Sequence, residues 1–584
     1  MADETPTVLR VDDLRIGFGE SLPVKGVSFS LRRGERVGLV GESGSGKSLT
    51  ALSIMRLAHG ATVTGRIMLE GQDLLQLPRR KMERIRGGQI AMIYQDPMSS
   101  LNPVQTIGRQ LVEAIRLHKT LSREQAKHEA IRLLDDVGVP NPEQRIGQYP
   151  HEFSGGMRQR VMIAMAMSAQ PQVLIADEPT TALDVTTQAR IIDLLDRLAN
   201  EHGTAVILIT HDLGVAAGFC ESIHVMRDGL VVERGPVDQI YHQPQHPYTK
   251  ALLASVVDLS IDVNRPIATT GEPAVSSASP SAATTPAPGL TPRSRTANSS
   301  DEAVLRIEGV SKSYRLGPGE VTRAVSDASF EIRRGETFGL VGESGSGKST
   351  IARLVLALTP VDSGSVRFDG HDVHSLSSKA MRHLRRRMQI VFQDPYSALN
   401  RSHSVKQIVT QPLVAHRIGD RKSRAERVAQ MLDLVGLGAE FSYRSPRTLS
   451  GGQCQRVAIA RALVLDPEFL VLDESVSALD VSIQAQVLNL LRDLQQRLGL
   501  TYLFISHDLA VIRYMAQHIA VMKQGVIVEQ GSRDELFSNP QHEYTRGLMA
   551  AIPVADPVIE RQRRRDAQAQ EDIDTTLEIG KVQP

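Results

Sequence analysis

The sequence predicts an α/β fold that occurs twice, once in each half of the 584 residues. Short apolar runs alternate with amphipathic stretches of helical periodicity, a pattern typical of a mainly parallel sheet with helices packed around it. The same polar motifs recur in the same order in both halves, which predicts two domains of similar size. The apolar runs 173–176 and 469–472 end in aspartate, and the runs 205–210 and 502–506 are followed by histidine. In such sheets, ligand-binding groups gather at the carboxyl ends of strands.

A glycine-rich loop stands between an apolar run and a helix-forming stretch in each half. Its letters, GESGSGKS, fit the pattern G-x-x-x-x-G-K-[ST] of a phosphate-binding loop. Glycines let successive N–H groups and a helix N-terminus point at phosphate oxygens, while the lysine reaches the β- and γ-phosphates and the last serine ligates Mg²⁺. We therefore predict nucleotide binding by Gly41, Glu42, Ser43, Gly44, Ser45, Gly46, Lys47 and Ser48, and by Gly342, Glu343, Ser344, Gly345, Ser346, Gly347, Lys348 and Ser349.

An acidic pair ends a buried apolar run in each half, as Asp177-Glu178 and Asp473-Glu474. A buried acidic pair without a cation would be costly, which favours a metal role. We expect Asp177 and Asp473 to contact Mg²⁺ through water, and Glu178 and Glu474 to orient or deprotonate the attacking water. Ordinary strand-end carboxylates are the alternative interpretation.

A Ser-Gly-Gly sequence precedes a long apolar-patterned helix in each half, predicted over 157–168 and 453–464. Such a helix start exposes unpaired N–H groups with a partial positive charge, and therefore offers a second anion-binding surface. By itself the tripeptide could be a simple N-cap turn, but its place shortly before the acidic pair in both halves makes it specific. The residues are Ser154, Gly155 and Gly156, and Ser450, Gly451 and Gly452.

Composition argues against several classes of protein. With 67 basic and 66 acidic residues the net charge is +1, which gives no global electrostatic case for a nucleic-acid-binding protein. The only cysteines are Cys220 and Cys454, so we expect neither a disulfide framework nor a C-x-x-C metal pair, and a reducing cytoplasm is the simplest compartment. The acidic N-terminus is unlike a secretory signal. The apolar run 161–176 is broken by Gln170 and Pro171, so we expect no membrane span.

Two segments have compositions that do not predict a packed core. Residues 272–300 are rich in Ser, Ala, Thr and Pro and nearly free of large apolar residues, which predicts a flexible linker over 259–302. The arginine cluster at 561–565 is followed by acidic residues, and we expect a disordered, solvated tail over 557–584.

Taken together, the motifs GESGSGKS, FSGGMRQR, VLIADEP, TALD and THD of the first half, and GESGSGKS, LSGGQCQR, FLVLDES, SALD and SHD of the second, resemble those of ATP-binding cassette (ABC) ATPases. The resemblance covers nearly the whole chain. It implies that each α/β domain has a mainly parallel sheet core, an antiparallel edge sheet and a helical subdomain. The implied domains are 6–258, with a helical subdomain near 98–165, and 303–556, with one near 396–461.

The resemblance also implies how ATP is held. Each ATP would lie between the phosphate loop of one cassette and the Ser-Gly-Gly of the other, in an internal pseudo-dimer that pairs Lys47 with Ser450 and Lys348 with Ser154. A histidine after a strand, or an aromatic within one, can also be purely structural. The resemblance further implies that Gln95 and Gln393 sense Mg²⁺ and the attacking water, and that His211 and His507 contact the γ-phosphate. It implies that Asp184 and Asp480 communicate across the interface, and that Phe18 and Tyr314 stack on adenine. The residues implied to bind Mg²⁺ are Ser48, Gln95 and Asp177 in the first half, and Ser349, Gln393 and Asp473 in the second.

The segments YQDPMSSLNP and FQDPYSALN, and the later QPQHPYT and NPQHEYT, resemble importers of oligopeptides, dipeptides and nickel. The first half is similar to their D-type ATPase and the second to their F-type. This implies a subunit that hydrolyses ATP at the cytoplasmic face of the membrane to energise uptake of peptides, including glutathione-like solutes. Two integral-membrane permease subunits, and indirectly an extracytoplasmic solute-binding protein, would be its partners. Because no cysteine lies between Cys220 and Cys454, we expect no iron-sulfur cluster of the kind some D-type relatives hold.

Three alternatives remain open at this point. A nickel importer would have the same ATPase. A translation-factor cassette protein would also be a tandem ATPase, but such proteins carry a long charged helical linker, whereas this linker is rich in Pro, Ser and Ala. DNA-repair cassettes carry zinc modules or long coiled coils, and neither cysteine pairs nor heptads occur here. We therefore expect no nucleic-acid partner.

Overall fold

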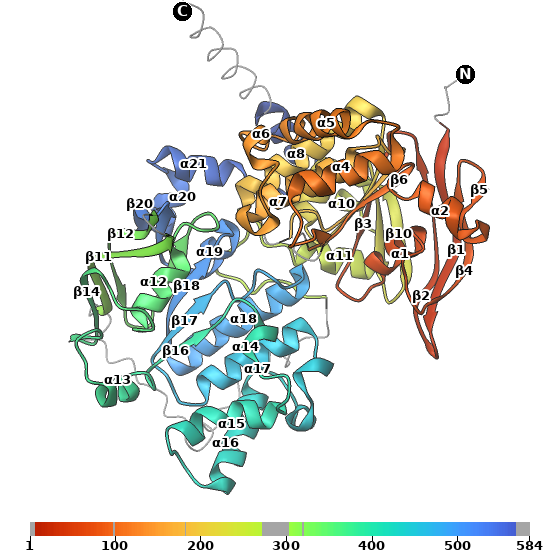
Figure 1. Cartoon of the computed structure of the whole chain (residues 1–584). Coiled ribbons are helices and arrows are strands. Elements are labelled where there is room, and N and C mark those ends of the chain that lie inside the picture. The colour runs from red at the N-terminus through yellow and green to blue at the C-terminus, as the bar shows by residue number, and fades with distance from the viewer. Residues whose placement is uncertain (1–5, 97–99, 182, 271–302, 318–319, 568–584) are drawn as a thin grey trace, which may run out of the picture. The chain divides into compact units, whose positions relative to one another are not determined.

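The computed structural model describes residues 6–96, 100–181, 183–270, 303–317 and 320–567 (Figure 1). Internal contacts divide the chain into two compact units. The first contains the described residues of Met1–Leu183, Thr187–Val256 and Pro553–Pro584, and the second contains those of Asp184–Thr186 and Val257–Ile552. No helix within the described ranges is long and apolar enough to cross a bilayer.

The first unit contains an antiparallel sheet and a larger mixed sheet. Its strands are β1 (Thr7–Phe18), β2 (Ser21–Arg32), β3 (Arg36–Val40), β4 (Thr62–Leu69), β5 (Gln72–Asp73), β6 (Ile90–Ile93), β7 (Val173–Asp177), β8 (Ala205–Thr210), β9 (Ser222–Arg227) and β10 (Leu230–Pro236). The antiparallel sheet has the order β2-β1-β4-β5 and the mixed sheet the order β10-β9-β3-β8-β7-β6. In the mixed sheet only β10 is antiparallel to its neighbour.

Helices cover the mixed sheet and form a separate cluster after β6. They are α1 (Lys47–Ile54), α2 (Arg79–Ile85), α4 (Ile107–His118), α5 (Arg123–Asp136), α6 (Pro142–Arg145), α7 (Gly155–Met167), α8 (Val185–His202), α9 (Leu213–Phe219), α10 (Val237–His242) and α11 (Pro247–Ala254), with the short 3₁₀ turns Leu74–Gln76 and Pro150–Glu152. Buried residues of α4, α5 and α7 belong to one core cluster with those of β6 to β8. The chain order therefore places a helical subdomain between β6 and β7, as the family resemblance implies.

The second unit repeats this architecture. Its strands are β11 (Ala303–Gly317), β12 (Glu320–Arg333), β13 (Thr337–Val341), β14 (Ser363–Phe368), β15 (His371–Asp372), β16 (Met388–Val391), β17 (Phe469–Asp473), β18 (Thr501–Ser506), β19 (His518–Lys523) and β20 (Val526–Ser532). The sheet orders are β12-β11-β14-β15 and β16-β17-β18-β13-β19-β20. The repeated order confirms two α/β domains, each with an antiparallel sheet and a mainly parallel sheet.

The helices of the second unit follow in the same sequence. They are α12 (Lys348–Val355), α13 (Ser378–Leu384), α14 (Pro395–Ala398), α15 (Val405–Ala415), α16 (Arg421–Leu434), α17 (Gly451–Leu463), α18 (Val481–Leu498), α19 (Leu509–Met515), α20 (Arg533–Ser538) and α21 (Glu543–Ala550), with 3₁₀ turns at Ala439–Tyr443 and Pro446–Thr448. The helices predicted over 157–168 and 453–464 are α7 and α17. Both begin two residues earlier, because the glycines themselves form the first turn.

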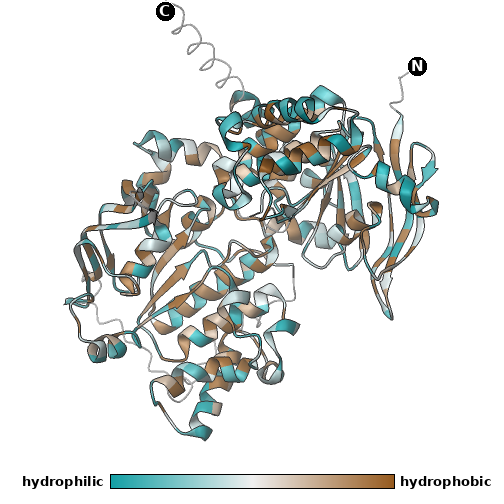
Figure 2. Cartoon of the chain, viewed as in Figure 1, coloured by the Kyte–Doolittle hydropathy of each residue, from teal (hydrophilic) through white to brown (hydrophobic). Residues whose placement is uncertain are grey.

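The mixed sheets are buried on both faces, which explains their nearly uninterrupted apolar strands. In β8, Ile207 and Ile209 belong to the core shared with the antiparallel sheet, whereas Val206 and Leu208 belong to the core beneath the helices. The strand β18 alternates in the same way between two cores of the second unit. Figure 2 shows the apolar residues concentrated on these strands. The parallel pairing places the ends of β3, β7 and β8 at one edge of the sheet, where their polar residues meet.

Two segments differ from their predicted disorder. Residues 259–270, assigned to a linker, belong to the second unit, and residues 557–567, assigned to a solvated tail, are helical and belong to the first unit. Arg561 and Arg564 of this segment form ion pairs with Asp238 and Asp193, so part of the charge cluster is docked, whereas Arg565 is exposed. The rest of the predicted linker and tail, residues 271–302 and 568–584, lies outside the described residues.

Candidate functional site

The phosphate loop of the first unit connects β3 to α1, in the strand, loop and helix order that the sequence predicts. Gly46, the residue before α1, has φ of 100°. A Cβ there would lie 2.9 Å from Val24 Cγ2, so the position favours glycine. In the second unit Gly347 stands before α12 with φ of 107°, and its Cβ would lie 2.2 Å from the carbonyl oxygen of Ala324. Both loops therefore direct the unpaired N–H groups of a helix start into the loop.

The lysine of each loop is buried and held by the loop itself. Lys47 Nζ donates to the carbonyl oxygens of Gly41 and Glu42, at 2.7 and 2.9 Å. Lys348 Nζ makes the same contacts with Gly342 and Glu343, each at 2.8 Å. Burial lowers the pKa of Lys348, and the carboxylates of Glu474 and Asp473 oppose this shift. The ammonium group is thus fixed in place before any phosphate enters, as an anion-binding loop requires.

A serine and an aspartate meet at the carboxyl end of β7 in the first unit and of β17 in the second. Ser48 Oγ donates to Asp177 Oδ1 at 2.9 Å, and Ser349 Oγ donates to Asp473 Oδ1 at 3.0 Å. Burial raises the pKa of Asp177 to about 6, with the hydrogen bond from Ser48 opposing and the nearby Glu178 adding to the shift. One hydroxyl and one carboxylate fit Mg²⁺, which usually takes few protein ligands and completes its octahedron with phosphate and water.

No cluster of three or more His, Cys, Asp or Glu side chains suited to a metal occurs among the residues that the structure describes.

Glu178 is the centre of a converging group of side chains. Gln95 Nε2 donates to Glu178 Oε2 at 2.7 Å, Thr181 Oγ1 donates to the same oxygen at 2.8 Å, and His211 Nδ1 lies 3.3 Å from Oε1. Burial favours the neutral acid, but the hydrogen bonds of His211 and Thr181 and the charge of Lys47 outweigh it and lower the pKa of Glu178 to about 2. Glu178 is therefore an ionised carboxylate at neutral pH, which is the form that accepts a proton.

The second site has the same centre with one changed neighbour. Gln393 Nε2 donates to Glu474 Oε2 at 2.7 Å, and His507 Nδ1 lies 3.6 Å from that oxygen. The residue equivalent to Thr181 is Ser477, whose hydroxyl donates to the backbone oxygen of Glu474 at 2.9 Å. Lys348 Nζ lies 3.7 Å from Glu474 Oε1. Burial again favours the acid, yet His507 and Lys348 lower the pKa of Glu474.

Both glutamates have a left-handed backbone, which the sequence did not reveal. The φ angles are 46° for Glu178 and 47° for Glu474, a conformation that is uncommon for any residue with a side chain. The backbone N–H of Glu178 donates to the Ile209 oxygen at 2.8 Å, and that of Glu474 to the Ile505 oxygen at 2.9 Å. The neighbouring strand thus holds the turn, and such strain is often found at functional positions.

A tyrosine hydroxyl contacts each phosphate loop, a second feature that sequence reasoning missed. The backbone N–H of Glu42 donates to Tyr248 Oη at 3.2 Å, and that of Glu343 to Tyr544 Oη at 3.1 Å. The guanidinium of Arg227 lies 4.9 Å from the centre of the Tyr248 ring. The tyrosines belong to the paired segments QPQHPYT and NPQHEYT, whose repetition was the available signal.

The remaining predicted site residues lie on other elements. Ser154 is the N-cap of α7, where its hydroxyl accepts from the N–H of Met157 at 3.3 Å, and Ser450 caps α17 in the same way. The turn interpretation is therefore correct, and it is compatible with an anion-binding role. Asp184 precedes α8 and accepts from Thr186 Oγ1 at 2.7 Å, and Asp480 is the N-cap residue of α18. Their proposed roles stay predictions.

The aromatic residues predicted to stack on adenine have different surroundings. Phe18 ends β1 and is 41% exposed, as a stacking surface requires. Tyr314 lies in β11 and is partly buried, with Lys312 Nζ 5.9 Å from its ring centre. For both residues adenine stacking stays a prediction.

Two protein-family models match the chain, each of them twice. The one described as ABC transporter matches residues 24–181 and 325–477, and the one described as oligopeptide/dipeptide transporter, C-terminal region, matches 232–279 and 528–581. The chain is 47% identical over 581 residues to the glutathione import ATP-binding protein GsiA of Salmonella paratyphi A, with 95% of this chain and 91% of the relative covered. It is 46% identical, with the same coverage, to the protein of that name from Escherichia coli K12.

Proposed function

Because this chain belongs to the family of ABC transporter ATPases, we propose that it powers the import of peptides of the glutathione or dipeptide type. The observation that carries the proposal is the similarity to glutathione import ATP-binding proteins along 95% of the chain. The match of both units to the C-terminal region of oligopeptide/dipeptide transporters supports the same class of solute. The match includes residues 259–279 of the predicted linker and residues 557–581 of the predicted tail.

Two sites with ionised glutamates support hydrolysis in both units. We propose that Lys47 and Lys348 neutralise the β- and γ-phosphates of ATP, while the N–H groups at the starts of α1 and α12 hold the phosphate oxygens. Ser48 with Asp177, and Ser349 with Asp473, would hold Mg²⁺, which when bound neutralises charge on the phosphates.

Glu178 and Glu474 would accept the proton of the attacking water. Gln95 Nε2 and Glu178 Oε2 are 2.7 Å apart, so one water can contact the amide and the carboxylate together. His211, on the opposite oxygen, keeps the carboxylate ionised and orients it. The proton then moves from water to Glu178 while the water oxygen bonds to the γ-phosphorus. The bond from that phosphorus to the β,γ-bridging oxygen breaks, so that ADP and inorganic phosphate are the products. Product release restores the free carboxylate, because its pKa lies far below neutral.

Transport also requires partners that provide a path through the membrane and deliver the solute. We propose two integral-membrane permease subunits, which hold the chain at the cytoplasmic face of the membrane, and an extracytoplasmic solute-binding protein that delivers the solute. Nucleotide binding and hydrolysis would shift the permease between its inward-facing and outward-facing states.

Reconstitution tests the proposal directly. The chain is assembled in vesicles with two permease subunits and their solute-binding protein, and uptake of labelled glutathione, a dipeptide and Ni²⁺ is compared with and without ATP. We expect ATP-dependent uptake of glutathione or the dipeptide, competed by the unlabelled solute. Uptake of Ni²⁺ alone would make the chain a nickel importer ATPase, and sedimentation with ribosomes without any uptake would overturn the transport role.

A further inference from the structure

Equivalent helix pairs of the two units carry contrasting side chains on the same face. The pairs are α8 with α9 in the first unit and α18 with α19 in the second. Both begin after the same motifs, so their residues correspond one to one. Among the positions that differ are Asp193 and Asn489, Asp196 and Arg492, Gly214 and Ala510, Ala217 and Arg513, and Gly218 and Tyr514.

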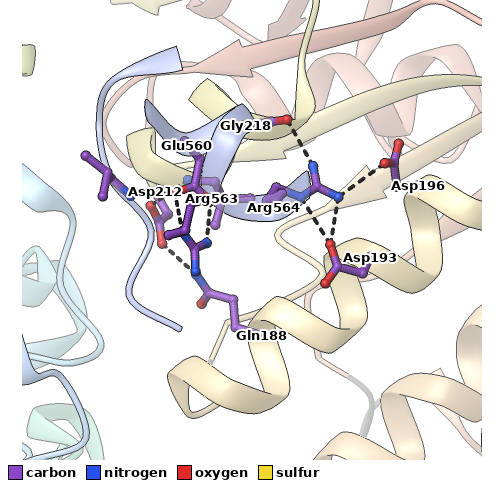
Figure 3. A network of polar contacts seen from close by, with 10 residues as sticks. Gln188, Asp193, Asp196, Asp212, Gly218, Glu560, Arg563 and Arg564 are labelled. Atoms are coloured by element: carbon purple, nitrogen blue, oxygen red, sulfur yellow. Dashed lines mark hydrogen bonds and ion pairs between the residues drawn. The ribbon is translucent and has the colours of Figure 1, made fainter. Parts of the chain in front are cut away.

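The first face binds the segment 553–567, which is helical from residue 557, through one largely buried arginine (Figure 3). Arg564 Nη2 lies 2.8 Å from Asp193 Oδ1 and 3.2 Å from Asp196 Oδ2, and its Nη1 donates to the Gly218 oxygen at 2.9 Å. The Arg564 side chain is only 11% exposed. Arg36 shares Asp196 at 2.7 Å. A largely desolvated guanidinium with charged partners and a carbonyl is a specific contact, unlike a surface ion pair.

Two glycines of α9 let this segment approach the helix closely. A Cβ on Gly214 would lie 2.8 Å from Pro553 Cβ, and one on Gly218 would lie 2.5 Å from Glu560 Cγ. Glu560 is 2% exposed and accepts from the N–H of Val554 at 2.9 Å. Glycine lowers helix stability, so two glycines one turn apart in a seven-residue helix indicate that close packing is required here.

The second face binds an irregular segment with turns, residues 257–270, by its backbone. Asn489 Oδ1 accepts from the N–H of Ile267 at 3.0 Å, and Asn489 Nδ2 donates to the Ile267 oxygen at 2.8 Å. Tyr514 Oη donates to the Arg265 oxygen at 3.1 Å, and Arg513 donates to the oxygens of Leu259 and Ile261. This face therefore presents mostly donors, and the segment presents mostly carbonyl oxygens.

We propose that the two faces are selective docking surfaces, the α8–α9 surface for residues 553–567 and the α18–α19 surface for residues 257–270. Exchange of the segments would be unfavourable on both sides. Arg564 would meet the like charge of Arg492, and Tyr514 would fill the space that Gly218 leaves for Glu560. On the α8–α9 surface, the carbonyl oxygens of 257–270 would face Asp193 and Asp196. This would be unfavourable because carboxylates, like carbonyl oxygens, only accept hydrogen bonds.

Selectivity explains why neither segment returns to the domain it follows. Residues 257–270 come after α11 of the first unit yet belong to the second, and residues 553–567 come after α21 of the second unit yet belong to the first. The two surfaces descend from one repeated helix pair, so shape alone would not distinguish them. The charge and glycine differences supply the distinction.

Hydrogen–deuterium exchange of the full-length chain tests the first surface. Without its contacts, a helix as short as 557–567 is marginal in water, so its protection reports docking. We expect Arg564→Asp to accelerate exchange over 557–567 at least tenfold while leaving 259–267 unchanged. The matched control is Arg565→Asp, since Arg565 is exposed and neighbours Arg564. Adding Asp193→Arg to Arg564→Asp should restore protection by recreating an opposite-charge pair.

The converse variant tests the second surface and the selectivity. Asn489→Asp replaces the donor to Ile267 by an acceptor. We therefore expect faster exchange over 259–267 and an unchanged exchange rate over 557–567. Unchanged protection of 557–567 in Arg564→Asp would overturn the proposal, as would loosening of both segments by either variant. Thermal unfolding of each variant distinguishes a lost contact from a lost fold.

Discussion

At the scale of single residues, Glu178 and Glu474 decide whether the sites work as proposed. Replacing both by glutamine keeps the shape but removes the proton acceptor. We expect steady-state ATP hydrolysis to fall by roughly 10²- to 10⁴-fold, the range of a positioned general base. ATP binding should persist, because the lysines and loops are intact, and a fluorescent ATP analogue measures it.

A control for that variant is Glu124→Gln, in the first turn of α5 and remote from the site by sequence and element. Its hydrolysis rate should equal that of the natural chain. Normal hydrolysis by the double glutamate variant would show that another group accepts the proton.

His224 gives the first unit a pH dependence of stability. Burial, with a smaller contribution from Arg234, lowers the pKa of His224 from 6.5 to about 4. In the unfolded chain His224 is protonated as the pH falls below about 6.5, whereas in the folded chain it stays neutral until about pH 4. The free energy of unfolding is therefore highest above pH 6.5 and falls as the pH drops through this range. The full effect is about 3 kcal/mol. We expect His224→Leu to reduce the loss, measured by calorimetry from pH 7.5 to 4.5.

The exposed His59 supplies the comparison for that measurement. His59→Leu should leave the pH profile unchanged. If His224→Leu also leaves it unchanged, the acid sensitivity arises elsewhere.

The corresponding residue of the second unit is Ala520. There, Phe338 replaces the smaller Val37 and stacks on Phe330, with ring centres 4.7 Å apart. The two domains thus fill one core position with different partners.

Residue identities in the site could be predicted, but their conformations could not. The motifs located Ser48 beside Asp177 and placed Gln95 and His211 with Glu178, because strand ends of a parallel sheet meet at one edge. The left-handed φ of Glu178 could not be predicted, since only its bond to the neighbouring strand favours it. The contact of Tyr248 with Glu42 joins residues 206 positions apart, beyond any local pattern.

At the scale of elements, two helix glycines show how packing can reverse the stabilisation that helix propensity predicts for a glycine-to-alanine substitution. In α4, a Cβ on Gly108 would lie 2.4 Å from Ile146 Cγ1 and 2.7 Å from the Ile146 oxygen, whereas in α21 a Cβ on Gly547 would meet nothing within 4 Å. We expect Gly547→Ala to stabilise its unit by about 0.5–1 kcal/mol. Gly108→Ala should instead destabilise, because the backbone oxygen cannot move aside as a side chain can.

Thermal denaturation of the two variants measures this difference. Gly547→Ala serves as the control for Gly108→Ala, since both make the same chemical change in a helix. Stabilisation by Gly108→Ala would mean that α4 can shift away from Ile146 at little cost.

Elements with local signals were predictable, and those that depend on distant partners were not. Apolar runs ending in polar motifs correctly predicted the strands β7, β8, β17 and β18. The helix over 557–567 was missed because the sequence shows only a charged cluster there. Its stabilising partner Asp193 lies 371 positions from Arg564. Similarly, the backbone of 257–270 is bound by Asn489, at a separation of 222 positions for Ile267.

At the scale of the whole molecule, the family resemblance implies two composite ATP sites, and pairs of substitutions test this. If Lys47 shares ATP with Ser450, then Lys47→Ala with Ser450→Arg disables one site and leaves the other complete. Lys47→Ala with Ser154→Arg disables both. We therefore expect more ATP binding at saturation in the first variant than in the second, about one nucleotide per chain against none, measured by equilibrium dialysis.

Lys47→Ala and Lys348→Ala alone provide the reference values. Equal binding by the two double variants would show that each unit completes its own site. The arginine is placed at a helix start, where a serine caps the first turn, so unfolding temperatures must accompany the binding data.

The unlike helix faces also bear on how such a protein could be divided or duplicated. Two copies of the first half would each offer an aspartate-lined, glycine-bearing face and a segment 257–270 that matches neither copy. Two copies of the second half would each offer the α18–α19 surface and a segment 553–567 that does not fit it. Mixed pairs alone satisfy both segments, so halves produced as separate polypeptides should sort into one of each kind, and the covalent fusion would enforce a stoichiometry that the surfaces already encode.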